Sequence, residues 1–192
     1  MIYEPSEDSY LIKRYIKRYS KNKKVLDVGT GSGILAKEAL KYTKDVTASD
    51  INKECLKNLK GIKTIHSDLF KKIKGKYDLI ISNPPYLPAD KGEDTKSALS
   101  TTGGKEGYEI LERFIKTLRP HLTKDGKAII IFSSLTKKDK VDSIIKENDF
   151  KLKLLGEEKD IPYEDLYCYL LFWMLFSINK YIIEVCTNKY ND

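Results

Sequence analysis

The feature that most constrains the fold is a pair of prolines that follows an apolar hexapeptide in the middle of the chain. Residues 77–82, Tyr-Asp-Leu-Ile-Ile-Ser, include two β-branched isoleucines and are typical of a buried strand. Asn83, Pro84, Pro85 and Tyr86 follow directly. Because each proline fixes φ and lacks a backbone N–H, the chain after Asn83 neither extends the sheet nor starts a helix. The pattern predicts a stiff polar corner at the carboxyl end of a strand, where open α/β sheets bind ligands.

This corner offers two hydrogen-bond acceptors to a planar nitrogen. The side-chain carbonyl of Asn83 and the backbone carbonyl of Pro84 can hold both hydrogens of an NH2 group and turn its lone pair toward an electrophile. The ring of Tyr86 gives a face for a flat amide or base. Residues 83–86 resemble the Asn-Pro-Pro-Tyr signature of amino methyltransferases, which transfer a methyl group from S-adenosylmethionine (SAM) to nitrogen. An ordinary Pro-Pro turn is the alternative interpretation.

A glycine-rich turn earlier in the chain predicts a cofactor site. Residues 24–28 are read as a strand, and a helix is expected from 34 to 42. The turn between them carries Gly29, Gly31 and Gly33. Position 34 is Ile, so the nicotinamide fingerprint is not matched, and the lysine of a phosphate-binding loop is missing too. The carboxylate of Asp27, two residues before the first glycine, would repel a pyrophosphate and attract a cationic ligand such as SAM.

Acids follow the next two predicted strands. Residues 45–50 end in Asp50, which lies 17 residues after Gly33. At a similar spacing in nucleotide-binding folds an acid reaches the ribose hydroxyls, although a helix cap for residues 54–59 is the alternative. A strand over 62–66 leads to Asp68 and Leu69. The Asp68 carboxylate is expected to accept a hydrogen bond from the adenine amino group, and the Leu69 side chain is expected to pack on the adenine ring.

Strands and helices alternate along the chain, which predicts an α/β, Rossmann-like, doubly wound sheet of about seven mostly parallel strands. After the corner, the polar stretch 87–105 is long enough for us to expect a substrate-binding lid. Further helices are expected over 106–118 and 137–147. The remaining strands are expected over 126–134, 150–156 and 165–172.

The two ends of the chain are expected to lie outside the alternating strands and helices of the sheet. Ser6 is a candidate N-cap for a helix to about Tyr19, with Glu7 and Asp8 in its first turn, where the helix dipole favours acids. A cofactor lid is the alternative role for this end. We therefore divide the chain into a methyltransferase domain over 1–172, with an N-terminal helix or lid over 1–22, and an apolar extension over 173–192 that packs on the domain or on a partner.

Composition excludes several classes of protein. Three cysteines, with no Cys-x-x-Cys pair, indicate a reducing compartment and no metal site. The chain starts without a secretory leader, and its longest apolar run, over 166–178, is shorter than a membrane span, so we expect a cytoplasmic protein. The net charge of +7 permits a nucleic-acid partner, but only four arginines are present, so such a partner is not favoured.

Six motifs together resemble the HemK-like class I methyltransferases, over about residues 2–172. They lie at residues 4–9, 27–33, 49–52, 67–69, 83–86 and 102–107. The resemblance is closest to the short eukaryotic and archaeal branch, which methylates the glutamine of the Gly-Gly-Gln motif in class 1 translation termination (release) factors. Because 26 residues precede Asp27, the N-terminal helical domain of bacterial relatives is expected to be absent.

The resemblance implies a site and a partner. The residues it places at SAM are Ser9, Asp27, Gly29, Gly31, Asp50, Asp68, Leu69 and Asn83. Asn83 would also touch the acceptor, together with Pro84, Pro85 and Tyr86. Members of the branch are heterodimers with a small zinc-binding activator subunit. Two departures concern the lid, which has Ser-Thr-Thr at 100–102 in place of an aromatic, and the apolar tail.

Three rival functions use the same features. An adenine-N6 methyltransferase acting on DNA or RNA would hold the exocyclic amine at the same corner. A protein lysine methyltransferase is a further alternative, although two amide-type acceptors suit a planar nitrogen better. A SAM-binding scaffold without catalysis is the non-enzymatic alternative, and the intact residues 83–86 argue against it.

Overall fold

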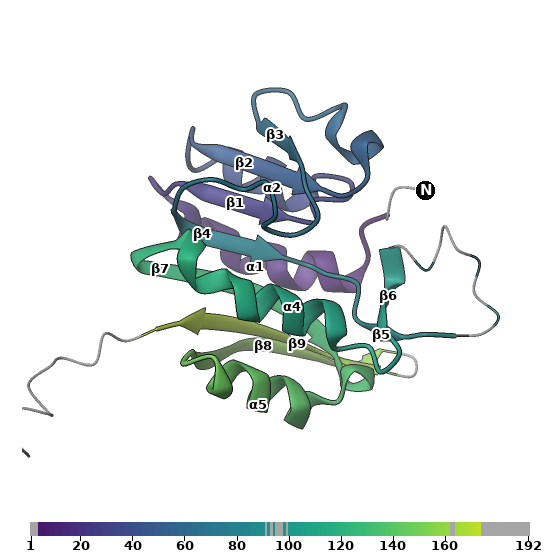
Figure 1. The fold of residues 1–192 in the computed structure, drawn as a ribbon. Coiled ribbons are helices and arrows are strands. Elements are labelled where there is room, and N and C mark those ends of the chain that lie inside the picture. The colour runs from purple at the N-terminus through teal and green to yellow at the C-terminus, as the bar shows by residue number, and fades with distance from the viewer. Residues whose placement is uncertain are drawn as a thin grey trace, which may run out of the picture.

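The computed structural model describes residues 4–161 and 164–173, apart from positions 91, 93, 95–97 and 99. The main strands are β1 (Val25–Val28), β2 (Val46–Asp50), β3 (Lys63–His66), β4 (Tyr77–Ser82), β7 (Leu122–Ser133), β8 (Lys151–Ile161) and β9 (Glu164–Phe172). They form one sheet in the order β3-β2-β1-β4-β7-β9-β8 (Figure 1). The first five strands of this order run parallel, whereas β9 is antiparallel to both β7 and β8. The predicted doubly wound, mostly parallel sheet is confirmed.

Helices cover both faces of the sheet. They are α1 (Glu7–Ser20), α2 (Ile34–Leu40), α4 (Glu109–Leu118) and α5 (Lys138–Glu147), with short 3-10 turns η1 (Lys53–Leu56), η2 (Arg119–His121) and η3 (Ser134–Thr136). Figure 1 shows α1 and α2 behind the sheet and α4 and α5 in front of it. Each helix presents an apolar stripe to the strands, as Leu11, Ile12 and Ile16 of α1 do at 0–1% exposure. This burial explains why the central strands are apolar on both faces.

Strand β4 lies at the point where the strand order reverses. Its residues Leu79, Ile80 and Ile81 are at most 1% exposed. β4 pairs with β1 so that Ser82 lies opposite Val28, and the Ser82 hydroxyl donates a hydrogen bond of 2.9 Å to the Val28 carbonyl oxygen. The glycine turn after β1 and the proline corner after β4 therefore leave the sheet side by side.

Several element boundaries differ from the sequence prediction. The expected helix over 54–59 is the 3-10 turn η1, in which the side chain of the N-cap residue Asn52 accepts a hydrogen bond of 3.1 Å from Glu54 N. Helix α4 begins at Glu109 rather than at residue 106, because Gly107 has a φ of +91°, which a helix excludes. β7 begins at Leu122, four residues early, where it pairs with Tyr77. β8 continues past residue 156 to Ile161 as a hairpin with β9.

The N-terminal helix begins where it was predicted to, but not with the expected cap. Ser6 occupies the N-cap position, yet its hydroxyl hydrogen-bonds the Glu7 carboxylate and not a backbone amide of the helix. α1 ends at Ser20, one residue after the predicted end, and α2 ends at Leu40, two residues before it.

The predicted lid is not wholly irregular. Its two ends form a small parallel pair, β5 (Leu87–Pro88) with β6 (Thr102–Gly104), which stands beside the end of β4 (Figure 1). Two consecutive short segments can pair in parallel here because the chain between them is long enough to return.

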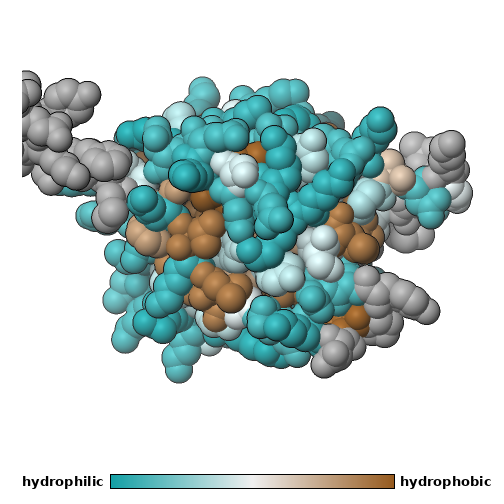
Figure 2. Space-filling view, turned by 90° about the horizontal axis from the view of Figure 1, so that it is seen from below, coloured by the Kyte–Doolittle hydropathy of each residue, from teal (hydrophilic) through white to brown (hydrophobic). Residues whose placement is uncertain are grey.

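Apolar side chains interrupt a mostly polar surface on the face seen from below, where β8 and α5 lie (Figure 2). On β8, the edge strand of the sheet, Leu152 and Leu154 are 38% and 45% exposed. The expected apolar extension over 173–192 lies outside the described residues, apart from Trp173, whose ring centroid is 4.7 Å from the Arg119 guanidinium. None of the helices in the described ranges is both long enough and apolar enough to cross a membrane.

Candidate functional site

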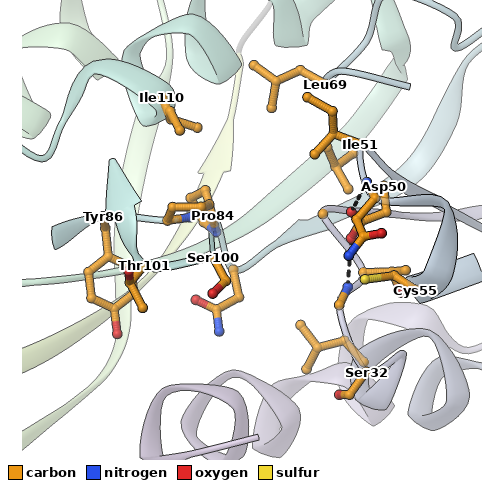
Figure 3. Close-up of a pocket in the computed structure, with 18 of the residues that line it drawn as sticks. Ser32, Asp50, Ile51, Cys55, Leu69, Pro84, Tyr86, Ser100, Thr101 and Ile110 are labelled. Carbon is orange, nitrogen blue, oxygen red and sulfur yellow. Dashed lines mark hydrogen bonds between the residues drawn. The ribbon is translucent and has the colours of Figure 1, made fainter. Parts of the chain in front are cut away.

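A cavity of about 380 Å³ opens at the carboxyl ends of β1, β2 and β4. Its volume is within the range of small-molecule sites. Figure 3 shows Asp50, Ile51 and Cys55 on one side and Tyr86 and Thr101 on the other, with Pro84 between them. After the groups that the sequence analysis expects there, we call these two sides the nucleoside half and the acceptor half.

The glycine turn forms the floor of the nucleoside half. Gly29 has a φ of +73°, and a side chain added there would meet nothing within 4 Å. The positive φ therefore requires the glycine, and the space beside it lets a ligand lie directly on the backbone. Gly33 has a φ of +77° and is also closely packed, because a Cβ there would lie 2.2 Å from Leu59.

Asp50 is fixed in the wall of this half by two backbone amides. One carboxylate oxygen accepts from Gly31 N at 2.9 Å and the other from Asn52 N at 2.7 Å (Figure 3). Each carboxylate oxygen has a second lone pair, so Asp50 keeps the capacity to accept from a ligand hydroxyl. Its predicted role at a ribose stays a prediction, with a geometry that suits it.

Asp27 lies beneath the glycine turn and is not among the residues that line the cavity. It is fully buried, and one oxygen accepts from Thr30 Oγ1 at 2.7 Å and from Ala36 N at 3.1 Å. These bonds tie the turn to the start of α2. Burial raises the pKa of Asp27 to about 7, against the lowering effect of those two hydrogen bonds. The structure thus gives this acid a role in holding the turn.

Asp68 lies in the cavity wall but has charged partners that the sequence prediction did not include. Its two oxygens accept from Arg113 Nη2 at 3.0 and 2.8 Å, and Lys71 lies 2.7 Å away. The hydrogen bond from Lys71, followed by that from Arg113, lowers the pKa of this carboxyl group. An adenine amino group at Asp68 would therefore share the carboxylate with Arg113, which itself lines the cavity.

The neighbouring residue, Leu69, is held in a strained backbone conformation. Its φ is +46°, in the left-handed region that residues with a side chain rarely adopt. Leu69 lines the cavity, and its side chain is labelled near Ile51 in Figure 3. Strain of this kind is frequent at ligand sites, where the surrounding structure maintains it.

The proline corner forms the acceptor half, and its asparagine is held by α1. Asn83 Nδ2 donates to Asp8 Oδ2 at 2.9 Å and lies 3.4 Å from Ser9 Oγ. Asp8 and Ser9, in the first turn of α1, are 3% and 2% exposed. Because the amide nitrogen is directed to α1, the carbonyl oxygen of Asn83 is the end of the amide that can accept from a bound group.

Tyr86 is held by both its side chain and its backbone. Its hydroxyl donates to Asp8 Oδ2 at 3.1 Å, and its backbone carbonyl accepts from Thr136 Oγ1 at 2.9 Å. The Tyr86 amide donates to the Thr101 carbonyl at 3.1 Å. With 8% of its surface exposed and these three hydrogen bonds, Tyr86 is packed into the cavity wall.

The predicted lid contacts the corner directly. Ser100 and Thr101 line the cavity. A Cβ on Gly103 would lie 2.0 Å from the Gly107 carbonyl oxygen and 2.8 Å from that of Pro85, so the lid backbone lies against the corner where only glycine fits. The lid's role in substrate binding stays a prediction.

Sequence reasoning missed several residues of the cavity. Ile51 and Cys55 follow Asp50 closely and could have been inferred from it. Arg113 and Ile110 come from α4, and nothing in their local pattern marks them. Asp8 was read as a dipole-stabilising acid, whereas its burial against Asn83 is the more informative property.

The chemistry of the cavity suits a cationic nucleoside. Two carboxylates, from Asp50 and Asp68, line it beside the apolar side chains of Ile51 and Leu69, and the carboxylate of Asp8 lines it at the proline corner, where it is bound to Asn83 and Tyr86. The residues present therefore fit SAM, which carries a sulfonium, an ammonium and an adenosine.

Comparisons with known proteins agree with this geometry. A family model described as methyltransferase small domain matches residues 8–155. A Methanocaldococcus jannaschii protein, provisionally named a protein N5-glutamine methyltransferase, is 38% identical over 86% of this chain and 88% of its own length. A release factor glutamine methyltransferase of Borreliella burgdorferi is 36% identical, and this chain spans about half of its length, 52%.

The solved structures include one similar chain of matching length. It belongs to the E. cuniculi Mtq2-Trm112 complex, which is described as responsible for the methylation of the eRF1 translation termination factor. That chain has a TM-score of 0.77 and 25% identity, over 90% of this chain and 99% of its own. The ribosomal protein L11 methylase of Lactobacillus delbrueckii has a TM-score of 0.65 and 26% identity, over 88% of this chain and 80% of its own.

Proposed function

Because the chain belongs to the methyltransferase small domain family, we propose that it transfers the methyl group of SAM to the side-chain amide nitrogen of a glutamine in a class 1 translation termination factor. The observation that carries the proposal is the orientation of Asn83, whose amide nitrogen is bound by α1 so that its carbonyl oxygen can face an acceptor. The names of the M. jannaschii and B. burgdorferi relatives support the same acceptor.

The nucleoside half would hold SAM. Gly29 and Gly31 provide open backbone, Asp50 accepts from the ribose hydroxyls, and Leu69 and Ile51 enclose the adenine. Ser9 and Asp68 complete the contacts that the family resemblance implies, and Asp27 supports the turn from below. When bound, SAM would supply a methyl group that its positive sulfur already activates. The sulfur would leave as a neutral thioether and the methylated nitrogen would lose its surplus proton to solvent, so no residue of the cavity has to act as a general base.

The acceptor half would position the glutamine. An amide nitrogen is a poor nucleophile because its lone pair is delocalised into the carbonyl. Acceptors at Asn83 Oδ1 and at the Pro84 carbonyl would bind the two N–H groups and shift electron density to the nitrogen as the new bond forms. Pro85 keeps this backbone rigid, and Tyr86 offers its ring face to the flat amide. The contribution of these residues is positioning and exclusion of water.

The test is transfer of labelled methyl from SAM to a purified class 1 termination factor. We expect incorporation into the factor and none into a variant in which the glutamine of the Gly-Gly-Gln motif is replaced by asparagine. Equal labelling of both factors would contradict the proposal.

A second acceptor class is tested in the same assay. The adenine amine is also planar, and one relative is named ribosomal RNA small subunit methyltransferase C, from Pseudoalteromonas translucida, although this chain spans only 38% of it. DNA and RNA substrates, and a lysine-containing peptide, would therefore be run beside the factor. Faster transfer to any of these would replace glutamine as the proposed acceptor.

We also propose that a small subunit assists this chain, by analogy with the two-protein E. cuniculi complex. The family resemblance implies that this subunit binds zinc and that the pair works in the cytoplasm, where termination factors act. Co-expression followed by size-exclusion chromatography tests it, with a stoichiometric complex as the expected result. A chain that is fully active alone would contradict it.

A further inference from the structure

We infer that Asp8 is a positioning residue that sets the orientation of the Asn83 amide and of the Tyr86 ring for the transfer step. This inference rests on the proposed function of the corner, and it concerns a residue outside the Asn-Pro-Pro-Tyr motif. Asp8 lies on a different element, 75 residues before Asn83 in the chain, and packing of α1 brings the two together.

The first step of the argument is the symmetry of an amide. The oxygen and nitrogen of an Asn side chain have nearly the same shape, so rotation by 180° exchanges them at little steric cost. Only one of the two orientations presents an acceptor to an NH2 group. A residue that distinguishes oxygen from nitrogen is needed to select it.

Asp8 makes this distinction because a carboxylate only accepts hydrogen bonds. Its Oδ2 lies 2.9 Å from Asn83 Nδ2, whereas the flipped amide would place two oxygens at that distance. The same oxygen accepts from the Tyr86 hydroxyl at 3.1 Å, and the other oxygen accepts from the Ser9 backbone amide. Asp8 is 3% exposed, so water has little access to weaken these charge-assisted bonds.

A second effect concerns the strength of the acceptor. A carboxylate that receives an N–H bond from an amide polarises that amide and makes its carbonyl oxygen more negative. The Asn83 oxygen would then bind the substrate N–H more strongly as positive charge develops on the nitrogen. Orientation and polarisation both act through Asn83 and leave SAM binding to other residues.

Asp8→Asn tests this role with little change in shape. The two oxygens of Asp8 face donors on both sides, from Ser9 N and from the pair Asn83 and Tyr86. The new NH2 group must therefore face a donor whichever way it turns. Glu7→Gln is the matched control, because it removes the same charge from the same helical turn at an exposed residue that does not line the cavity.

We expect kcat for the termination factor to fall about 10- to 100-fold in Asp8→Asn, the range typical of a misplaced reacting group. The Kd of SAM by calorimetry and the thermal midpoint should stay close to those of Glu7→Gln, which should retain the wild-type kcat. An Asp8→Asn enzyme with wild-type kcat would overturn the inference. So would a loss of SAM affinity as large as the loss of kcat, because Asp8 would then be a cofactor ligand.

A readout that does not use turnover separates this inference from the proposed function. In ¹⁵N–¹H spectra of the full chain, the side-chain NH2 signals of Asn83 are identified by their absence in Asn83→Ala. An amide proton that is hydrogen-bonded to a carboxylate resonates downfield. Asp8→Asn should therefore shift one of these two signals upfield, while Glu7→Gln should leave both in place. If the wild type, assayed together with its small subunit, fails to methylate the factor but the shift occurs, the proposed function fails and the positioning role stands. If the signals do not move, the positioning role fails.

Discussion

The two halves of the cavity are built in different ways. The nucleoside half is made largely of short contiguous segments, in which the glycine turn follows β1 and Asp50 ends β2, and Asp50 is fixed by backbone amides. The acceptor half is fixed by side chains from distant elements, since Asp8 of α1 holds Asn83 and Tyr86, and Thr136 of η3 holds the backbone of Tyr86. Because different contacts fix the two halves, mutations should be able to change cofactor affinity and transfer rate separately.

The largest effect should come from Asn83→Ala, which removes one of the two proposed acceptors of the NH2 group. We expect kcat to fall by at least about 100-fold, the cost of losing one preorganised partner of the transition state. The Kd of SAM should change less than about threefold, since Asp50 and the turn are untouched. Methyl-transfer kinetics and calorimetry measure the two quantities. A fall in both by the same factor would break the division between the halves.

Asp50→Asn should have the opposite signature. The amide that replaces the carboxylate must place an NH2 group against Gly31 N or Asn52 N, and it weakens any bond from the ribose hydroxyls. We expect the Kd of SAM to rise about tenfold or more, from the 1.5–3 kcal/mol typical of a hydrogen bond to a charged group. At saturating SAM, kcat should stay within about threefold of wild type. Unchanged affinity in a calorimetric titration would rule out this role.

The buried acid beneath the glycine turn, Asp27, predicts a dependence of stability on pH. The folded-state pKa of Asp27 is about 7, above its ordinary value of 3.8, because the carboxyl group is buried. The folded state therefore binds more protons between about pH 4 and 7, so this group stabilises the fold at low pH and its contribution is lost as the pH rises through 7.

Asp27→Asn cannot titrate and should flatten that dependence by up to about 1.4 kcal/mol per pH unit. Urea unfolding between pH 4.5 and 7 measures the slope. Asp45→Asn, at an exposed acid just before β2, is the control. If both variants change the slope equally, burial at residue 27 is not its cause.

The smallest effect is expected at the rim. Arg113→Ala removes the ion pair between Arg113, whose side chain is 52% exposed, and Asp68, whose side chain is 25% exposed. Because exposed ion pairs contribute little, the free energy of unfolding should change by less than about 1 kcal/mol. If Asp68 has to share its carboxylate between Arg113 and the adenine amino group, SAM affinity should rise about two- to threefold. Lys116→Ala, on the solvent side of the same helix, is the control. A weaker affinity for SAM would mean that Arg113 is itself a ligand.

Sequence reasoning succeeded where the physical cause is local. The strand over 77–82, its interruption by Pro84 and Pro85, and the turn at residues 29–33 follow from the properties of consecutive residues, and the mostly parallel, doubly wound sheet follows from the alternation of strands and helices. The fold prediction is confirmed, whereas the assigned roles of the site residues stay predictions with a geometry that suits them.

Sequence reasoning failed where the cause is packing between distant segments. Arg113 reaches Asp68 over 45 residues and Asp8 reaches Asn83 over 75, and both contacts depend on how a helix lies against the sheet. The start of α4 was misplaced for a different reason, since Gly107 has a positive φ and lies where a side chain would meet the backbones of Tyr86 and Pro88. A periodic pattern of apolar residues does not contain either kind of information.

At Leu69, the left-handed backbone and the contacts of the side chain make opposite demands on the residue type. Glycine adopts that conformation without penalty, so Leu69→Gly would relieve the strain there. The same exchange would remove a branched side chain from the cavity wall. The leucine at this position therefore keeps a branched side chain against the core and in the cavity wall while its backbone stays strained.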